Sequence, residues 1–113
     1  MLGSSHMKKE LQQSLFKKYP VIFRKKDSPG FSGIQCPDSW HFLLDALCLE
    51  IQSHVNEQIS SRVSVRSLVP VRDYCGVEVD QVKEKFGQLR FYVTGDDDYV
   101  RGLVRMAESI SKN

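Results

Sequence analysis

Alternation of apolar and polar residues is clearest in residues 81–93, Gln-Val-Lys-Glu-Lys-Phe-Gly-Gln-Leu-Arg-Phe-Tyr-Val. Because successive side chains of a β-strand point to opposite faces, this segment predicts two strands joined by a turn at Gly87. With Gly87-Gln88 as a two-residue type II′ loop, Phe86 would pair with Leu89. The apolar face would carry Val82, Phe86, Leu89, Phe91 and Val93. The opposite face would carry Lys83, Lys85, Arg90 and Tyr92.

Glu84 is the one charged residue that this alternation places on the apolar face. A buried carboxylate must be paired or hydrogen-bonded, or its pKa must rise. We therefore expect Glu84 to lie near a sheet edge or to have a partner. A slip of one residue would exchange the two faces and turn three cations inward, so burial should fix the register.

Apolar residues at spacings of three and four predict three helices, over residues 8–18, 39–60 and 97–111. The first should end at Tyr19-Pro20, because a residue before proline avoids the α-helical region. Asp38 is a candidate N-cap of the second helix, and the aspartates at 96–98 are candidate caps of the third.

Other apolar runs predict the remaining strands. Residues 21–23 suit a short strand, residues 62–69 alternate like a strand with an edge or bulge near Pro70, and residues 77–80 lead into the hairpin. The sequence therefore predicts an α+β fold, with a small antiparallel sheet of three to four strands and helices packed on one face.

Length and composition indicate a single domain. Of the 113 residues, 1–7 have the character of an expression-tag remnant, and 8–113 are expected to form one α+β domain. Three cysteines without regular spacing make a disulfide framework unlikely and favour a reducing, cytoplasmic location. We expect no membrane segment, since no run of about 18 apolar residues occurs.

The polar face of the hairpin is the candidate binding site. Arginine offers a planar fork for phosphate or carboxylate, lysine a point charge, and tyrosine a ring on which a base can stack. If the strand at 62–69 pairs alongside, Arg62 and Arg66 would join the same face. Solvated sheet faces are commonly charged, however, and on alternation alone we favour that simpler interpretation.

The spacing of cysteines and histidines gives little support for a metal site or a catalytic site. Cys36, Cys75, His41 and His54 lack the close ligand pairs of structural zinc, and the spacing does not demand a cysteine–histidine nucleophile. No phosphate-binding loop, HExxH or serine-nucleophile motif occurs. We therefore predict no catalytic residues, no metal and no cofactor.

Two segments together resemble a family of small phage and prophage proteins. These are Cys36-Pro-Asp-Ser-Trp40, which precedes a leucine-rich helix, and the hairpin at 81–93. The family pattern has a Cys-x-x-Gly-Trp helix start and a Gln-Val-Lys-Glu-Lys-Phe-Gly-Gly-Leu-Arg-Phe-Tyr hairpin, and the resemblance covers roughly residues 34–110. Ser39 and Gln88 depart from it by replacing glycines. The cysteine-rich tail of many relatives is not present, so no metal role is carried over.

The resemblance implies that the protein belongs to a mobile genetic element, but it implies no biochemical mechanism. Our leading hypothesis is a non-catalytic accessory protein that binds an anionic, nucleotide-type ligand, with counter-defence as the expected biology. The alternatives are a protein-interaction module that inhibits a host enzyme or defence protein, and a nucleic-acid-binding protein. A homodimer could form through the strand edge expected at 62–69.

Overall fold

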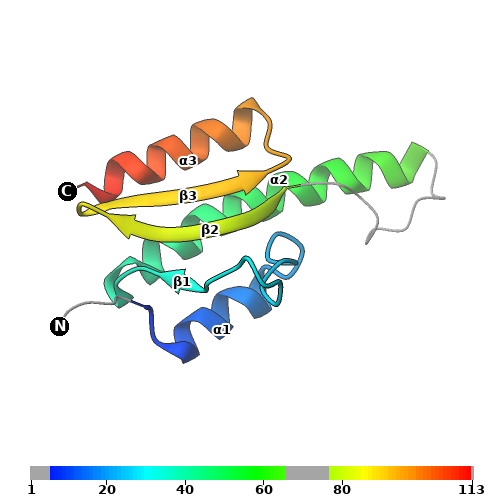
Figure 1. The fold of residues 1–113 in the computed structure, drawn as a ribbon. Coiled ribbons are helices and arrows are strands. Elements are labelled where there is room, and N and C mark those ends of the chain that lie inside the picture. Colours follow the sequence, from blue (N-terminus) through cyan, green and yellow to red (C-terminus); the bar gives the residue numbers. More distant parts are fainter. Residues whose placement is uncertain (1–5, 66–76, 113) are drawn as a thin grey trace.

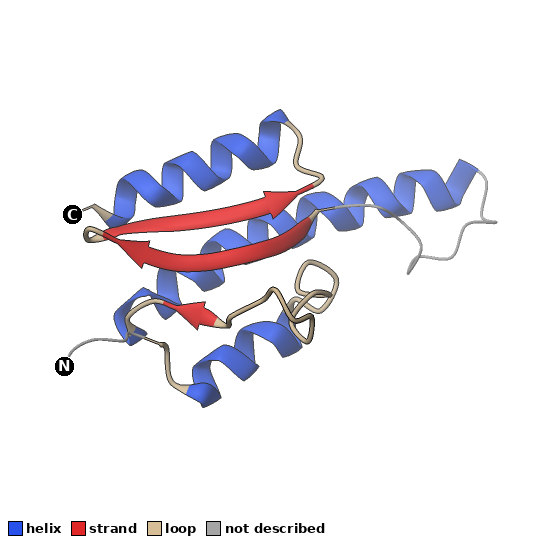
Figure 2. Cartoon of the chain, in the orientation of Figure 1, coloured by secondary structure: helices blue, strands red, loops and turns tan. Residues whose placement is uncertain are grey.

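The computed structural model describes residues 6–65 and 77–112, with the side chains of 58–65 left aside, and it has an α+β fold (Figures 1 and 2). Three strands form one sheet in the order β1-β2-β3. In chain order the elements are α1 (Lys9–Lys18), β1 (Ile34–Gln35), the 3-10 helix η1 (Asp38–Trp40), α2 (His41–Val65), β2 (Glu78–Lys85), β3 (Gln88–Thr94) and α3 (Asp98–Ser111).

The sheet is mixed, which corrects the antiparallel sheet predicted from the sequence. β2 and β3 are antiparallel, but the two-residue β1 runs parallel to β2, with Ile34 opposite Val82. Figure 1 shows α2 passing behind the sheet, α3 running along the β3 side and α1 lying on the β1 side. No described helix crosses the face that points towards the viewer in this figure. That face carries the candidate site.

The helices follow the predicted spacing, but one of the two predicted caps is wrong. The Asp97 carboxylate accepts a hydrogen bond from the Val100 backbone N–H at 2.9 Å, which caps α3 as expected. Asp38 instead accepts from the Lys8 backbone N–H at 2.9 Å, directly before α1. Its carboxylate therefore satisfies an amide at the start of α1, and Pro37 takes the N-cap position of η1.

Two of the predicted strands are wrong. Residues 21–23 form turns, although the Val79 backbone N–H donates to the Ile22 carbonyl at 2.8 Å and ties this segment to β2. Residues 62–65 are the last turn of α2, and 66–69 lie outside the described residues. A helix already stabilised by a long buried stripe can extend through a few β-branched residues, because tertiary packing outweighs their weak propensity.

One hydrophobic core joins all the layers. It contains side chains from α1, the 19–23 turn, β1, α2, the hairpin and α3. Phe23 is among its largest members, and its ring makes edge-to-face contacts with Phe16 and Phe31. Met7, at the expected boundary of the tag remnant, is also buried, and its backbone N–H donates to the Ile34 carbonyl at 3.0 Å.

The hairpin turn lies one residue earlier than predicted. Lys85 pairs with Gln88, so Phe86 and Gly87 form the two-residue loop, with φ values of 55° and 77°. Two successive positive φ values define a type I′ geometry, whose twist matches that of the flanking strands. The predicted pairing list is therefore wrong, and Phe86 is 92% exposed instead of lying on the apolar face.

Among the described residues, none of the helices is both long enough and apolar enough to cross a membrane.

Candidate anion-binding face

The four hairpin side chains that were predicted to share the polar face do share it. Lys83 lies opposite Arg90, and two residues further from the turn Gln81 lies opposite Tyr92. Directly opposite residues of an antiparallel pair project from the same face of a sheet. The Lys83 Nζ lies 5.9 Å from the centroid of the Tyr92 ring, which is a cation–π contact. Lys85, next to the turn, belongs to the same face.

No acid of the described residues forms an ion pair with the three cations at the turn end, Lys83, Lys85 and Arg90. Glu84, the nearest acid in sequence, accepts a hydrogen bond from the Gly87 backbone N–H at 2.6 Å. This bond confirms that Glu84 has a partner. The turn end of the face therefore presents concentrated positive charge.

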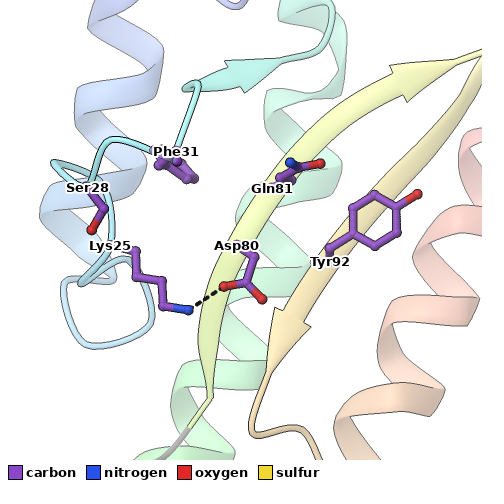
Figure 3. A pocket seen from close by; sticks show the side chains of 7 residues that line it. Lys25, Ser28, Phe31, Asp80, Gln81 and Tyr92 are labelled. Carbon is purple, nitrogen blue, oxygen red and sulfur yellow. Dashed lines mark hydrogen bonds and ion pairs between the residues drawn. The ribbon is translucent and has the colours of Figure 1, made fainter.

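The opposite end of the face is arranged differently, around a bulge. The register shifts between Val79 and Gln81, so Asp80 is an extra residue that bends β2. Its carboxylate accepts a hydrogen bond from the Lys25 Nζ at 2.6 Å (Figure 3). The Thr94 hydroxyl donates a second hydrogen bond to the same carboxylate. Although partial burial opposes the change, these two hydrogen bonds lower the pKa of Asp80.

A second ion pair holds the loop that contains Lys25, residues 20–31, to the sheet. The Arg24 guanidinium lies 2.9 Å from the Glu78 carboxylate, and the Lys25 Nζ lies 3.6 Å from it. The hydrogen bond with Asp80 is the main reason that the pKa of Lys25 is raised. These basic residues are therefore occupied in fastening the loop.

A shallow hollow of about 240 Å³ lies on this face beside the loop (Figure 3). Its walls are Lys25, Ser28, Gly30, Phe31, Asp80, Gln81 and Tyr92. Tyr92 also borders a second hollow of about 260 Å³ between β3 and α3, which Arg101, Arg105 and Glu108 help to line. The exposed ring of Tyr92 therefore stands between two concave areas.

Sequence reasoning missed the loop and α3 residues of these hollows. Phe31 and Lys25 come from the segment before β1 and Arg105 comes from α3, and neither segment was predicted to contribute residues to the site. No local pattern marks them, because they reach the face through tertiary packing. Of the further predicted residues, Arg62 lies in α2, so the strand that was to bring it beside the hairpin is wrong. Arg66 lies outside the described residues.

The edge of β3 beside the second hollow is closed by side chains of α3. The Leu89 backbone N–H donates to the Ser111 hydroxyl at 2.8 Å, and the Phe91 N–H donates to the Glu108 carboxylate at 3.2 Å. Unpaired strand edges invite pairing with another chain. Here α3 satisfies these two donors, so neither is available for pairing with another strand.

The two cysteines that the structure describes are core residues. Cys36 and Cys48 are both fully buried, and Cys75 lies outside the described residues. Burial, with a smaller contribution from Glu84, raises the pKa of the Cys36 thiol to about 12, and burial raises the pKa of Cys48 as well. Both thiols therefore stay protonated near neutral pH. In the ranges 6–65 and 77–112, no three His, Cys, Asp or Glu residues are grouped so that they could hold a metal ion.

No protein-family model, curated protein or solved structure matches this chain. The function of the protein is therefore inferred from the geometry of its sheet face.

Proposed function

We propose that the protein is a non-catalytic binding protein that holds an anionic, nucleotide-type ligand on the open face of its sheet. The observation that carries this proposal is the cross-strand pair of Lys83 and Arg90, with Lys85 beside it and no carboxylate among the described residues to neutralise them. Like charges directly opposite each other destabilise a sheet. An anion bound between them would turn that repulsion into attraction.

The residue types on this face suit a phosphate ester attached to a ring. Arg90 can form two parallel hydrogen bonds with one phosphate, and Lys83 and Lys85 add flexible point charges. Hydrogen bonds with charged groups contribute about 1.5–3 kcal/mol each. Tyr92, next along the face, offers a half-exposed ring, and the amide of Gln81 opposite it can both donate and accept hydrogen bonds.

The resemblance of the hairpin to phage and prophage proteins supplies the biological setting of the proposal. A small accessory protein that binds a nucleotide without converting it would act by sequestration. Counter-defence by removal of a nucleotide signal is therefore the role that we propose for it in the host cytoplasm.

Isothermal titration calorimetry with nucleoside mono-, di- and triphosphates and cyclic nucleotides tests the proposal. The double variant Lys83→Gln/Arg90→Gln should weaken binding by at least about 100-fold, as expected if two charge-assisted hydrogen bonds are lost. Its matched control is Lys9→Gln/Lys17→Gln on the exposed surface of α1, which removes the same charge far from the face. Absence of binding heat with every nucleotide, or equal weakening in both variants, would contradict the proposal.

A second candidate function, inhibition of a protein partner, is favoured by exposed apolar side chains on the helices. Phe42 of α2 is 85% exposed, Leu49 follows it by seven residues, and Met106 and Ile110 are exposed on α3. These spacings align the residues of each helix into a row. If this surface binds the partner, Phe42→Asp/Met106→Asp should abolish capture of a single stoichiometric protein from host lysate, whereas Lys83→Gln/Arg90→Gln should retain it.

A further inference from the structure

Phe86 at the hairpin tip is both strained and exposed. Its φ of 55° lies in the left-handed region, which bulky side chains rarely adopt and where Gly, Asn and Asp are preferred. Its side chain is 92% exposed, so burial does not offset the strain. A local rule that is broken without a structural gain is expected at functional positions. The ring is therefore a candidate contact for a ligand.

At the hairpin tip a lysine lies beside an aromatic ring, and the same arrangement occurs further along the hairpin. The Lys85 Nζ lies 5.9 Å from the centroid of the Phe86 ring, and the Lys83 Nζ lies 5.9 Å from that of Tyr92. Each exposed ring thus has one lysine beside it, and Arg90 faces Lys83 between them. The lysines are two residues apart, roughly 7 Å along the strand.

We infer that this row of side chains is a track for single-stranded nucleic acid, in which bases stack on Phe86 and Tyr92 while the intervening phosphates lie on Lys85, Lys83 and Arg90. The inference rests on the proposed function, since it names the ligand class of the same face. Stacking on aromatic rings combined with a basic path for the backbone is the general mode by which proteins hold single strands. The spacing of the lysines is close to that of successive phosphates in an extended strand.

The linear order of these groups favours a single strand over an anionic membrane. A membrane-inserting tip needs its cations at one depth around the apolar residue. Here the cations step back from Phe86 along β2 and β3, and Tyr92 lies opposite Gln81, roughly 14 Å along the strand from Lys85. A duplex would hide its bases from both rings.

Fluorescence anisotropy with four DNA probes tests the inference: a twelve-nucleotide oligothymidine, an abasic strand of the same length, a twelve-base-pair duplex and thymidine monophosphate as competitor. The oligothymidine should bind at least tenfold more tightly than the other three. Phe86→Asn and Tyr92→Ala should each weaken oligothymidine binding about tenfold and leave abasic-strand binding unchanged. Tyr99→Ala, which removes another half-exposed aromatic ring, on α3, is the matched control and should have no effect.

Salt dependence gives a second readout. Three phosphate contacts predict a slope of log K against log salt of about −2, and Lys85→Gln should reduce its magnitude by about 0.7. Equal affinity for the abasic strand, an unaffected Phe86→Asn variant, or binding to phosphatidylserine vesicles that depends on Phe86 would overturn the inference. A nucleotide that binds as tightly as the oligothymidine would refute the track and leave the proposed function intact. If no nucleotide or strand binds, both fail.

Discussion

The two ends of one sheet face carry similar numbers of basic residues but use them differently. At the bulge end, Lys25 and Arg24 are bound to Asp80 and Glu78. At the turn end, Lys83 and Arg90 lie opposite each other and form no ion pair with a carboxylate of the described chain. A count of basic residues alone would treat the two ends as nearly equal.

The difference indicates that the partners of a basic residue, and not its charge alone, determine whether its charge is available to a ligand. At the bulge end, ion pairs of the basic residues hold the 20–31 loop against β2. This loop supplies residues to the hydrophobic core. At the turn end, no loop of the described residues is held to the sheet by Lys83, Lys85 or Arg90. Mutations at the bulge end should therefore change stability, and mutations at the turn end should change binding.

The largest effect expected from this comparison is that of Phe23→Ala in the loop. Phe23 is 1% exposed and contacts the rings of Phe16 and Phe31, so its removal leaves a cavity in the core. Large-to-small changes of this kind cost about 3–5 kcal/mol. Urea denaturation should show this loss, and hydrogen exchange should show reduced protection of the Val79 amide, which donates to Ile22.

The control for this prediction is Phe42→Ala, since Phe42 is 85% exposed on α2. It should change the free energy of unfolding by less than about 0.5 kcal/mol. If both phenylalanine variants were equally stable, the loop would not be part of the core, and the contrast between the two ends would lose its basis.

The faces of the hairpin could be predicted from the sequence, but its register could not. The predicted and observed pairings differ by two residues on the partner strand, for example Val82 with Val93 against Val82 with Phe91. A shift of two residues keeps almost every side chain on its own face, so hydrophobic alternation cannot detect it. Phe86 moves from a strand into the turn, and Gln88 moves from the turn into β3, opposite Lys85.

The site residues that come from distant segments of the chain could not be predicted from local sequence patterns. Lys83, Lys85, Arg90 and Tyr92 follow from the alternation of two adjacent strands, and the structure places them together. Phe31 and Arg105 border the same face only because of how the 20–31 loop and α3 pack. The Asp80 bulge has no distinct sequence signal, since aspartate fits the polar alternation of a regular strand as well.

A smaller effect is expected from Asp80→Asn at the bulge end. The variant weakens the hydrogen bonds with Lys25 and Thr94, and because both charges are about one-third exposed, solvent screening limits the loss to about 1 kcal/mol. Lys83→Gln, the matched change at the turn end, should cost less than about 0.5 kcal/mol. Chemical denaturation of the two variants at pH 7 measures the difference.

The same variant should flatten the acid limb of the stability curve. The folded-state pKa of Asp80 is lowered, so its contribution is fully present above the unfolded-state value of about 3.9 and is lost as the pH falls towards the folded value. Wild-type protein should therefore lose more stability than Asp80→Asn between pH 5 and pH 3, an illustrative range around that value. If the two proteins lost stability equally as the pH falls, the pair of Lys25 and Asp80 would contribute no more to stability than the turn-end cations do.

The smallest effect is expected from Phe86→Asn and has the opposite sign. Asparagine adopts the left-handed region more readily than phenylalanine, and the ring of Phe86 is almost fully exposed, so little burial is lost. We expect a gain of about 0.5–1 kcal/mol in the free energy of unfolding. Thermal denaturation beside Phe42→Ala, which relieves no strain, measures it. A variant that is more stable yet binds more weakly would show that the turn end trades stability for contact with a ligand, whereas a loss of stability would show that Phe86 supports the fold.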